Sequence, residues 1–273
     1  MRKQPGKSLA PLVLRLCLGV TFLWAGMGKI EGRMGVQGAN AATLANMGVV
    51  ELIQRAAPDP PPPTILTPDA PKPTPEPKIP TPESKPAPPT APVVPALVGP
   101  QQLKAVHYPE PISVARVYGM ALLLKNAAFP ALTDRPTPPR ALWPKALAGG
   151  KWPLIIAWSV AVAEIACGVG VLLGLVSRVA SWGIVTIMLG AIWLTQVGPA
   201  LQTGNTMLGL LPKYELYSVD SWTPLLWQLS LLSSALALAL MGPGPIALDR
   251  RLFPPPPPPP PASGQTPRDG RPI

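Results

Sequence analysis

The chain has 273 residues, of which 47% are hydrophobic and only 13% charged, against roughly 25% charged in an average soluble domain. Its apolar residues gather in some blocks and its 43 prolines in others, which excludes a single large soluble core. The net charge of +10 lacks the clustered basic and aromatic residues of a nucleic-acid surface. A single histidine, and two cysteines with no neighbouring cysteine, exclude histidine-rich metal sites and disulfide frameworks. We therefore expect the lipid bilayer as a partner, and neither nucleic acid nor a metal ion.

The first apolar run, Leu9 to Gly28, follows a basic leader and has the ~20 residues that a helix needs to cross a bilayer. A signal peptide is the alternative, because an Ala-Asn-Ala lies at residues 39–41. That site lies too far beyond the apolar run, and the run itself contains Arg15. We therefore predict that residues 1–30 form a cytoplasmic leader and a retained transmembrane helix.

Residues 31–151 are predicted to form an insert on the extracytoplasmic side. The sequence at 41–57 is typical of a short amphipathic helix, and 58–100 is a proline-rich linker that favours extended polyproline II. Residues 112–129 are apolar but interrupted by two basic residues, a pattern that favours an interfacial helix lying on the membrane.

Three further membrane spans are predicted within residues 152–241. They are Trp152–Leu175, Val179–Val197 and Trp222–Met241. The remaining residues, 242–273, are predicted to form a disordered, proline-rich tail. The predicted fold class is therefore an all-α membrane protein, a four-transmembrane-helix bundle with a long proline-rich insert between helices 1 and 2.

The charge distribution indicates an orientation. An even number of spans places both termini on one side, and the basic residues near the span ends would gather there. The positive-inside rule makes that side cytoplasmic. We expect a multi-pass protein of a bacterial-type plasma (inner) membrane, with the N- and C-termini inside.

Glu164 is the one acidic residue inside a predicted span, where a charge costs roughly 2.5–3.5 kcal/mol unless it has a partner, a cavity or a task. Counting the helical rise from the cytoplasmic ends puts Arg15 ~9 Å deep and Glu164 ~16 Å deep, within reach of an arginine side chain. The pair is either a structural ion pair that fixes helix register or a proton or ligand site facing a cavity. Lys29, at the outer end of the first span, is interpreted as a snorkelling anchor.

Two other reactive side-chain types have simpler interpretations. Cys17 and Cys167 come out at similar depth, so a redox thiol pair is a hypothesis, but buried cysteine usually acts as a small hydrophobe. His107 is expected to be solvated. No phosphate loop, catalytic triad or metal-ligand spacing is present, so we assign no catalytic residue and expect no independent enzyme.

Three stretches resemble the DoxX family of small four-helix membrane proteins. They are RLCLGVTFLWAGMGK at 15–29, EIACGVGVLLGLVSR at 164–178 and GPGPIALDRRL at 242–252. The chain departs from the family's usual pattern by its insert, from Pro58 to about Lys151, and by its proline tail. The resemblance singles out further motif positions, which are Gly26, Lys29, Gly168, Gly174, Arg178 and Asp249, with Asp249 a plausible partner for Arg178 or Arg250.

What the resemblance implies about function is a link to membrane redox chemistry. It suggests an accessory or quinone-linked subunit of a membrane-associated redox system, with an oxidoreductase as partner and a quinone as the possible cofactor. The alternatives are a non-enzymatic membrane scaffold, a small-solute transporter, or an envelope tether that works through the proline-rich linker.

Overall fold

The computed structural model describes residues 6–58, 102–130, 139–242, 244 and 247–248. The predicted proline-rich linker, most of the tail, and Asp249 lie outside the described residues. The chain divides into two compact units. One contains residues 1–35 and 113–273, and the other contains residues 36–112.

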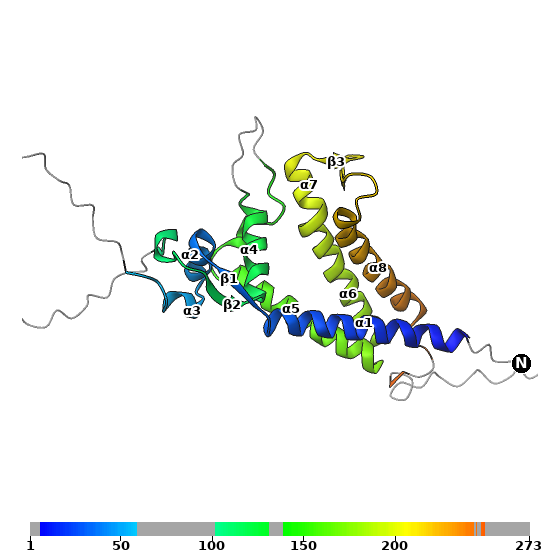
Figure 1. The fold of residues 1–273 in the computed structure, drawn as a ribbon. Helices are drawn as coiled ribbons and strands as arrows, with labels where there is room; N and C mark the ends of the chain where they lie inside the picture. Colours follow the sequence, from blue (N-terminus) through cyan, green and yellow to red (C-terminus); the bar gives the residue numbers. More distant parts are fainter. Residues whose placement is uncertain (1–5, 59–101, 131–138, 243, 245–246, 249–273) are drawn as a thin grey trace, which may run out of the picture. The chain divides into compact units, whose positions relative to one another are not determined.

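The larger unit contains four helices long and apolar enough to cross a membrane, as predicted (Figure 1). Helix α1 spans Gly6–Ile30, α5 spans Trp152–Leu173, and α8 spans Val219–Met241. The third span is longer than expected, because α6 (Ser177–Ile192) continues through a π-helical turn, η3 (Trp193–Val197), into α7 (Gly198–Thr203). Helix α1 packs along α5, and α6 packs along α8.

Helices α5 and α6 are joined by a tight turn with left-handed backbone. Gly174 has φ +71° and is the C-cap of α5, and its N–H donates to the Val171 carbonyl at 3.1 Å. Val176 also has positive φ, +50°, although a β-branched residue rarely adopts it. The turn sends α6 back antiparallel to α5 within three residues.

Part of the predicted interfacial helix is a strand. Residues Ile112–Ala115 form β2, which pairs with β1 (Arg33–Val36), and the helix α4 begins only at Val117 and ends at Ala128. The alternation Ile-Ser-Val-Ala places two β-branched residues on one face, which suits a strand and weakens a helix. Helix α4 packs against α5, where Tyr118 and Trp158 meet edge to face with ring centroids 6.4 Å apart. A short 3₁₀ turn, η2 (Lys145–Ala148), precedes α5.

The smaller unit replaces the predicted single helix at 41–57 by two. Helix α2 spans Gly38–Met47 and α3 spans Val50–Ile53. Gly48, with φ +104°, ends α2 because glycine takes the left-handed conformation of a helix C-cap without strain. The unit also includes the 3₁₀ turn η1 (Ala105–His107).

His107 is buried, contrary to the prediction of a solvated side chain. Its Nδ1 accepts a hydrogen bond from the Lys104 N–H at 2.9 Å. The neighbouring Tyr108 is also buried, and its hydroxyl donates to the Leu52 carbonyl at 3.0 Å. Burial raises the pKa of the Tyr108 hydroxyl, which keeps it a neutral donor over the whole physiological range.

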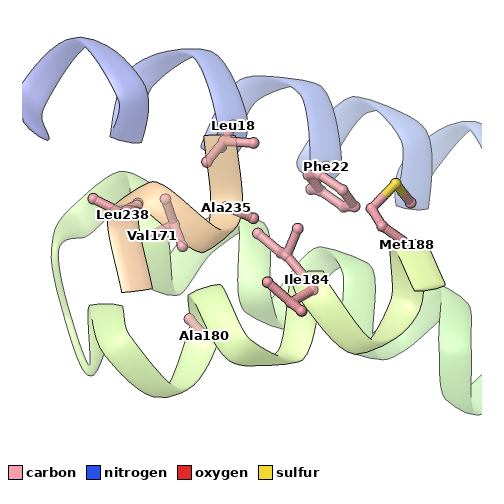
Figure 2. Close-up of a cluster of buried hydrophobic side chains, with 9 residues drawn as sticks. Leu18, Phe22, Val171, Ala180, Ile184, Met188, Ala235 and Leu238 are labelled. Carbon is pink, nitrogen blue, oxygen red and sulfur yellow. The ribbon is translucent and has the colours of Figure 1, made fainter. Parts of the chain in front are cut away.

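A cluster of buried apolar side chains joins the four membrane spans (Figure 2). Phe22 of α1 points toward Ile184 and Met188 of α6. Its members come from the middle of α1, the last turn of α5, the first half of the third span and the second half of α8; they are Leu18, Phe22, Val171, Ala180, Ile184, Val185, Met188, Ala235 and Leu238. Because lipid is as apolar as these side chains, the cluster stabilises the bundle through close packing.

We expect Phe22→Ala to lower the free energy of unfolding by about 2 kcal/mol. The substitution leaves a cavity, but the hydrophobic transfer term is small because the surroundings of the bundle are lipid and not water. Val20→Ala is the matched control, since Val20 lies on the exposed face of the same helix. Thermal unfolding in detergent micelles, followed by far-ultraviolet circular dichroism, measures both. Equal effects of the two substitutions would contradict the packing assigned to Phe22.

Candidate functional site

Helix α5 turns one narrow stripe of side chains toward the bundle. Its buried residues follow one another at intervals of three or four, and they are Pro153, Ala157, Ala161, Glu164, Gly168 and Val171. This spacing keeps them on one face of a helix. Glu164 therefore faces a neighbouring helix, with an exposed side-chain fraction of 4%.

The neighbour is α1, and the two backbones approach closely at glycines. A Cβ added to Gly26 would lie 2.6 Å from the Ile165 side chain, and one added to Gly168 would lie 2.7 Å from the Leu23 nitrogen. At Gly19 a Cβ would lie 2.8 Å from the Leu172 Cβ. We call this contact the α1–α5 seam. It runs antiparallel, since Gly19 lies beside Leu172 and Gly26 beside Ile165.

At one end of the seam, the Lys29 Nζ forms a hydrogen-bonded salt bridge with the Glu164 Oε2. Glu164 thus pairs with Lys29, which the sequence analysis had interpreted as an anchor, whereas that analysis had predicted Arg15 as its partner. Side chains on a helix lean toward its N-terminus. In antiparallel helices, Lys29 therefore leans inward along α1 while Glu164 leans outward along α5, and the two meet.

The same lean carries Arg15 away from Glu164, to the other end of the seam. Its Nε donates to the Val171 carbonyl at 3.0 Å and its Nη2 donates to the Leu172 carbonyl at 3.1 Å. These carbonyls belong to the last turn of α5, where the helix dipole favours a cation. The buried guanidinium also lies so close to Gly174 that a Cβ there would overlap it. Arg15 thus caps α5.

The family-motif residues fall into the same framework. Gly26 and Gly168 form the seam, Lys29 pairs with Glu164, and Gly174 makes room for Arg15. Arg178 lies beside the end of α8, where a Cβ on Gly242 would be 3.2 Å from its Nε. Its predicted pairing with Asp249 concerns a residue outside the described part of the chain.

The two cysteines have different surroundings. Cys17 is exposed on α1, whereas Cys167 packs toward α6, where a Cβ on Gly183 would be 2.7 Å from its Sγ. Nothing brings the two thiols together as the redox hypothesis requires. Among the described residues, no three His, Cys, Asp or Glu side chains gather as metal ligands would.

A second polar cluster, which the sequence analysis missed, surrounds the π-helical turn η3. The Tyr214 hydroxyl donates to the buried Gln196 Oε1 at 2.8 Å. The Gln228 Nε2 of α8 donates to the Thr195 Oγ1 at 3.1 Å. The signal was present in the sequence as two glutamines inside apolar spans, because such polar groups need partners in a bilayer. π-Helical turns are frequent at functional sites, although this one also fixes α6 against α8.

Comparison with known proteins finds one family model that matches part of the chain. The family model described as DoxX matches residues 112–197, from β2 through η3. This confirms the resemblance to the DoxX family, and the matched stretch contains Glu164, Gly168, Gly174 and Arg178. The match also takes in residues 112–151, which the sequence analysis assigned to the insert. No curated protein and no solved structure matches the chain significantly.

We expect Lys29→Met to lower the free energy of unfolding by about 2–3 kcal/mol, because it leaves the Glu164 carboxylate buried without its cation. The partial exposure of the Lys29 side chain, 28%, keeps this below the cost at a fully buried site. Replacing both residues, Lys29→Met with Glu164→Leu, should recover most of the loss. Lys145→Met, at an exposed lysine outside the spans, is the control. Thermal unfolding in micelles is measured for the unsubstituted protein, for both single variants, for the double variant and for the control. A double variant whose loss equals the sum of the two single losses would contradict the pairing.

Gly174→Ala should cost about 1–2 kcal/mol through its left-handed backbone alone, and more through the overlap with Arg15. In an Arg15→Leu background the second part should disappear, so that the same substitution becomes less costly. The measurement is a double-mutant cycle of unfolding free energies. If Gly174→Ala costs the same in both backgrounds, Arg15 does not press against this turn.

Proposed function

Because this chain is a multi-pass membrane protein with a DoxX domain, we propose that it is an accessory, quinone-linked subunit of a membrane-associated redox system. The observation that carries the proposal is the Lys29–Glu164 pair. It sets an ammonium and a carboxylate inside an otherwise apolar seam. We place both termini in the cytoplasm, which puts the pair nearer the outer face of a bacterial-type inner membrane.

The chemistry of the pair fits a quinone headgroup. The Lys29 ammonium is partly exposed and has three N–H donors, of which the salt bridge to Glu164 uses one. A second N–H can bind a quinone carbonyl oxygen, while the Glu164 carboxylate can accept a proton from the solvent side and then pass it on. A bound quinone would supply two-electron, two-proton redox chemistry, with the electrons coming from an associated oxidoreductase. This chain's own part is to bind and orient the headgroup and to move a proton at Glu164.

The test is quinone-dependent oxidation of thiosulfate or of a small thiol, in membranes with and without the protein. Glu164→Gln keeps the hydrogen bond to Lys29 but removes the proton carrier, so we expect turnover to fall at unchanged protein abundance. Glu215→Gln, at an exposed carboxylate in the loop before α8, is the matched control and should retain full turnover. No difference between membranes with and without the protein, together with no co-purifying redox enzyme, would falsify the proposal.

A second candidate function, an envelope tether, is supported by the smaller unit. The Asn46 side chain bonds both the N–H and the C=O of Leu103, each at 2.9 Å. The Ala57 N–H donates to the His107 carbonyl, also at 2.9 Å. The chain segments before and after the proline-rich linker are therefore fastened to one another within the same small unit. Such a base would hold residues 58 and 102, on either side of the linker, on one small unit.

The tether hypothesis predicts that the composition of the linker matters. Replacing residues 59–101 by a Gly/Ser segment of equal length keeps the number of residues but removes the proline-rich composition. If the linker is the working part, a co-purifying envelope partner should be lost while the melting temperature of the helical bundle is unchanged. If the partner still co-purifies after the replacement, the tether hypothesis is wrong.

A further inference from the structure

A small hairpin with an exposed apolar tip connects the third and fourth spans. Strand β3 (Thr206–Met207) pairs antiparallel with β4 (Leu211–Pro212), with Met207 opposite Leu211. The large apolar side chains of the hairpin, of the segment before α8 and of the first residue of α8 are exposed. They are Met207, Leu208, Leu210, Leu211, Leu216, Tyr217 and Val219. Leu208 is 89% exposed and Tyr217 is 92% exposed, so their side chains lie almost entirely outside the protein.

The turn of this hairpin has a leucine at a position where asparagine or glycine would adopt the backbone conformation at a lower energy. Leu208 has φ +55° and Gly209 has φ +75°, and the Leu210 N–H donates to the Met207 carbonyl at 3.4 Å. Positive φ at both central residues is the pattern of a type I′ turn, which favours Asn-Gly. Leucine at the first of these positions costs roughly 1–2 kcal/mol. In water, both the strained backbone and the exposed side chain of Leu208 would be unfavourable. Contact of the Leu208 side chain with an apolar environment is the simplest interaction that would offset both costs.

The hairpin is held firmly at the end of two membrane spans. The Asn205 N–H donates to the Ala200 carbonyl of α7 at 3.0 Å, and the Lys213 N–H donates to the Asn205 carbonyl at 2.9 Å. On the other side, the ring of Tyr214 meets that of Trp222 at 5.4 Å. These contacts fix the hairpin to α7 and α8 and restrict how far it can move from the membrane.

The length of the third span sets the depth. Residues Ser177–Thr203 form 27 residues of continuous helix, roughly 40 Å at the helical rise. That is close to the thickness of a bilayer with its headgroup layers included. The hairpin therefore emerges within the headgroup layer on this side, next to the acyl chains. Its composition of leucine, tyrosine and one lysine is the mixture that partitions into this layer.

We propose that the hairpin at 205–213, together with residues 216–219, inserts its apolar tip into the adjacent leaflet of the bilayer. Leu208 and Leu210 enter the acyl region, Tyr217 lies at the headgroup level, and the Lys213 ammonium faces the lipid phosphates. This surface is continuous with the lipid-facing sides of the spans. It clamps the ends of α7 and α8 to the membrane surface, independently of any role of the Lys29–Glu164 pair.

The test places a fluorescent bimane label at Leu208→Cys in the full chain, with Cys17 and Cys167 replaced by alanine. The protein is reconstituted in phosphatidylcholine–phosphatidylglycerol vesicles, with iodide on both sides. Glu215→Cys is the matched control on the same connection. We expect quenching of the Leu208 label by lipids carrying a shallow doxyl group, a blue-shifted emission, and iodide quenching about threefold weaker than at Glu215.

Two outcomes overturn the proposal. One is equal iodide quenching at both positions without quenching by doxyl lipids, which would leave the tip in water. The other is protection from iodide that grows with the protein-to-lipid ratio without doxyl quenching, which would assign the tip to a second copy of the chain. A further variant guards against an effect of the label itself. With the label at Leu210→Cys, an added Leu208→Asn keeps the turn but should weaken the doxyl quenching.

Discussion

The close approach of α1 and α5 is the constraint on which the rest of the bundle depends. Glycines at positions 19, 26 and 168 let the two backbones touch, and at each of them a Cβ would overlap the other helix. Because the two backbones are this close, long side chains of α1 can face α5 only at the two ends of the seam. Arg15 lies at one end and Lys29 at the other. Each cation is bound there by α5, one by a carboxylate and one by the carbonyls of the last turn. The seam thereby fixes both the depth of Glu164 and the identity of its partner.

The four spans could be predicted from the sequence because apolar runs of spanning length are a strong signal, and their core faces follow from a helical period. The partner of Glu164 could not be predicted by counting depth. Arg15 and Glu164 differ by only ~7 Å in depth, but the lean of side chains toward each N-terminus separates them and brings Lys29 inward. Depth along the axis is a property of Cα positions, whereas a salt bridge depends on where the long side chains end.

Other differences have local causes. Gly48 divides the predicted helix at 41–57, and the β-branched residues of 112–115 make a strand of what an apolar run had suggested was helix. The π-helical turn at 193–197 has no sequence signature, because it arises when a helix accommodates one extra residue against its neighbours. Its glutamine was nevertheless visible as a polar residue in an apolar span. Polar residues in apolar spans could thus be identified from the sequence. Their hydrogen-bond and salt-bridge partners could not, because these depend on how the helices pack.

The seam also decides how a headgroup could approach the buried pair. The Glu164 side chain is only 4% exposed, whereas the Lys29 side chain, at the end of α1, is 28% exposed. A Cβ at Gly19, Gly26 or Gly168 would already overlap the other helix, so no ligand fits between the two backbones along the seam. A headgroup would therefore meet the Lys29 ammonium first, and Glu164 would act on it through the salt bridge. The fold could thus admit a ligand at the end of the seam without separating α1 from α5.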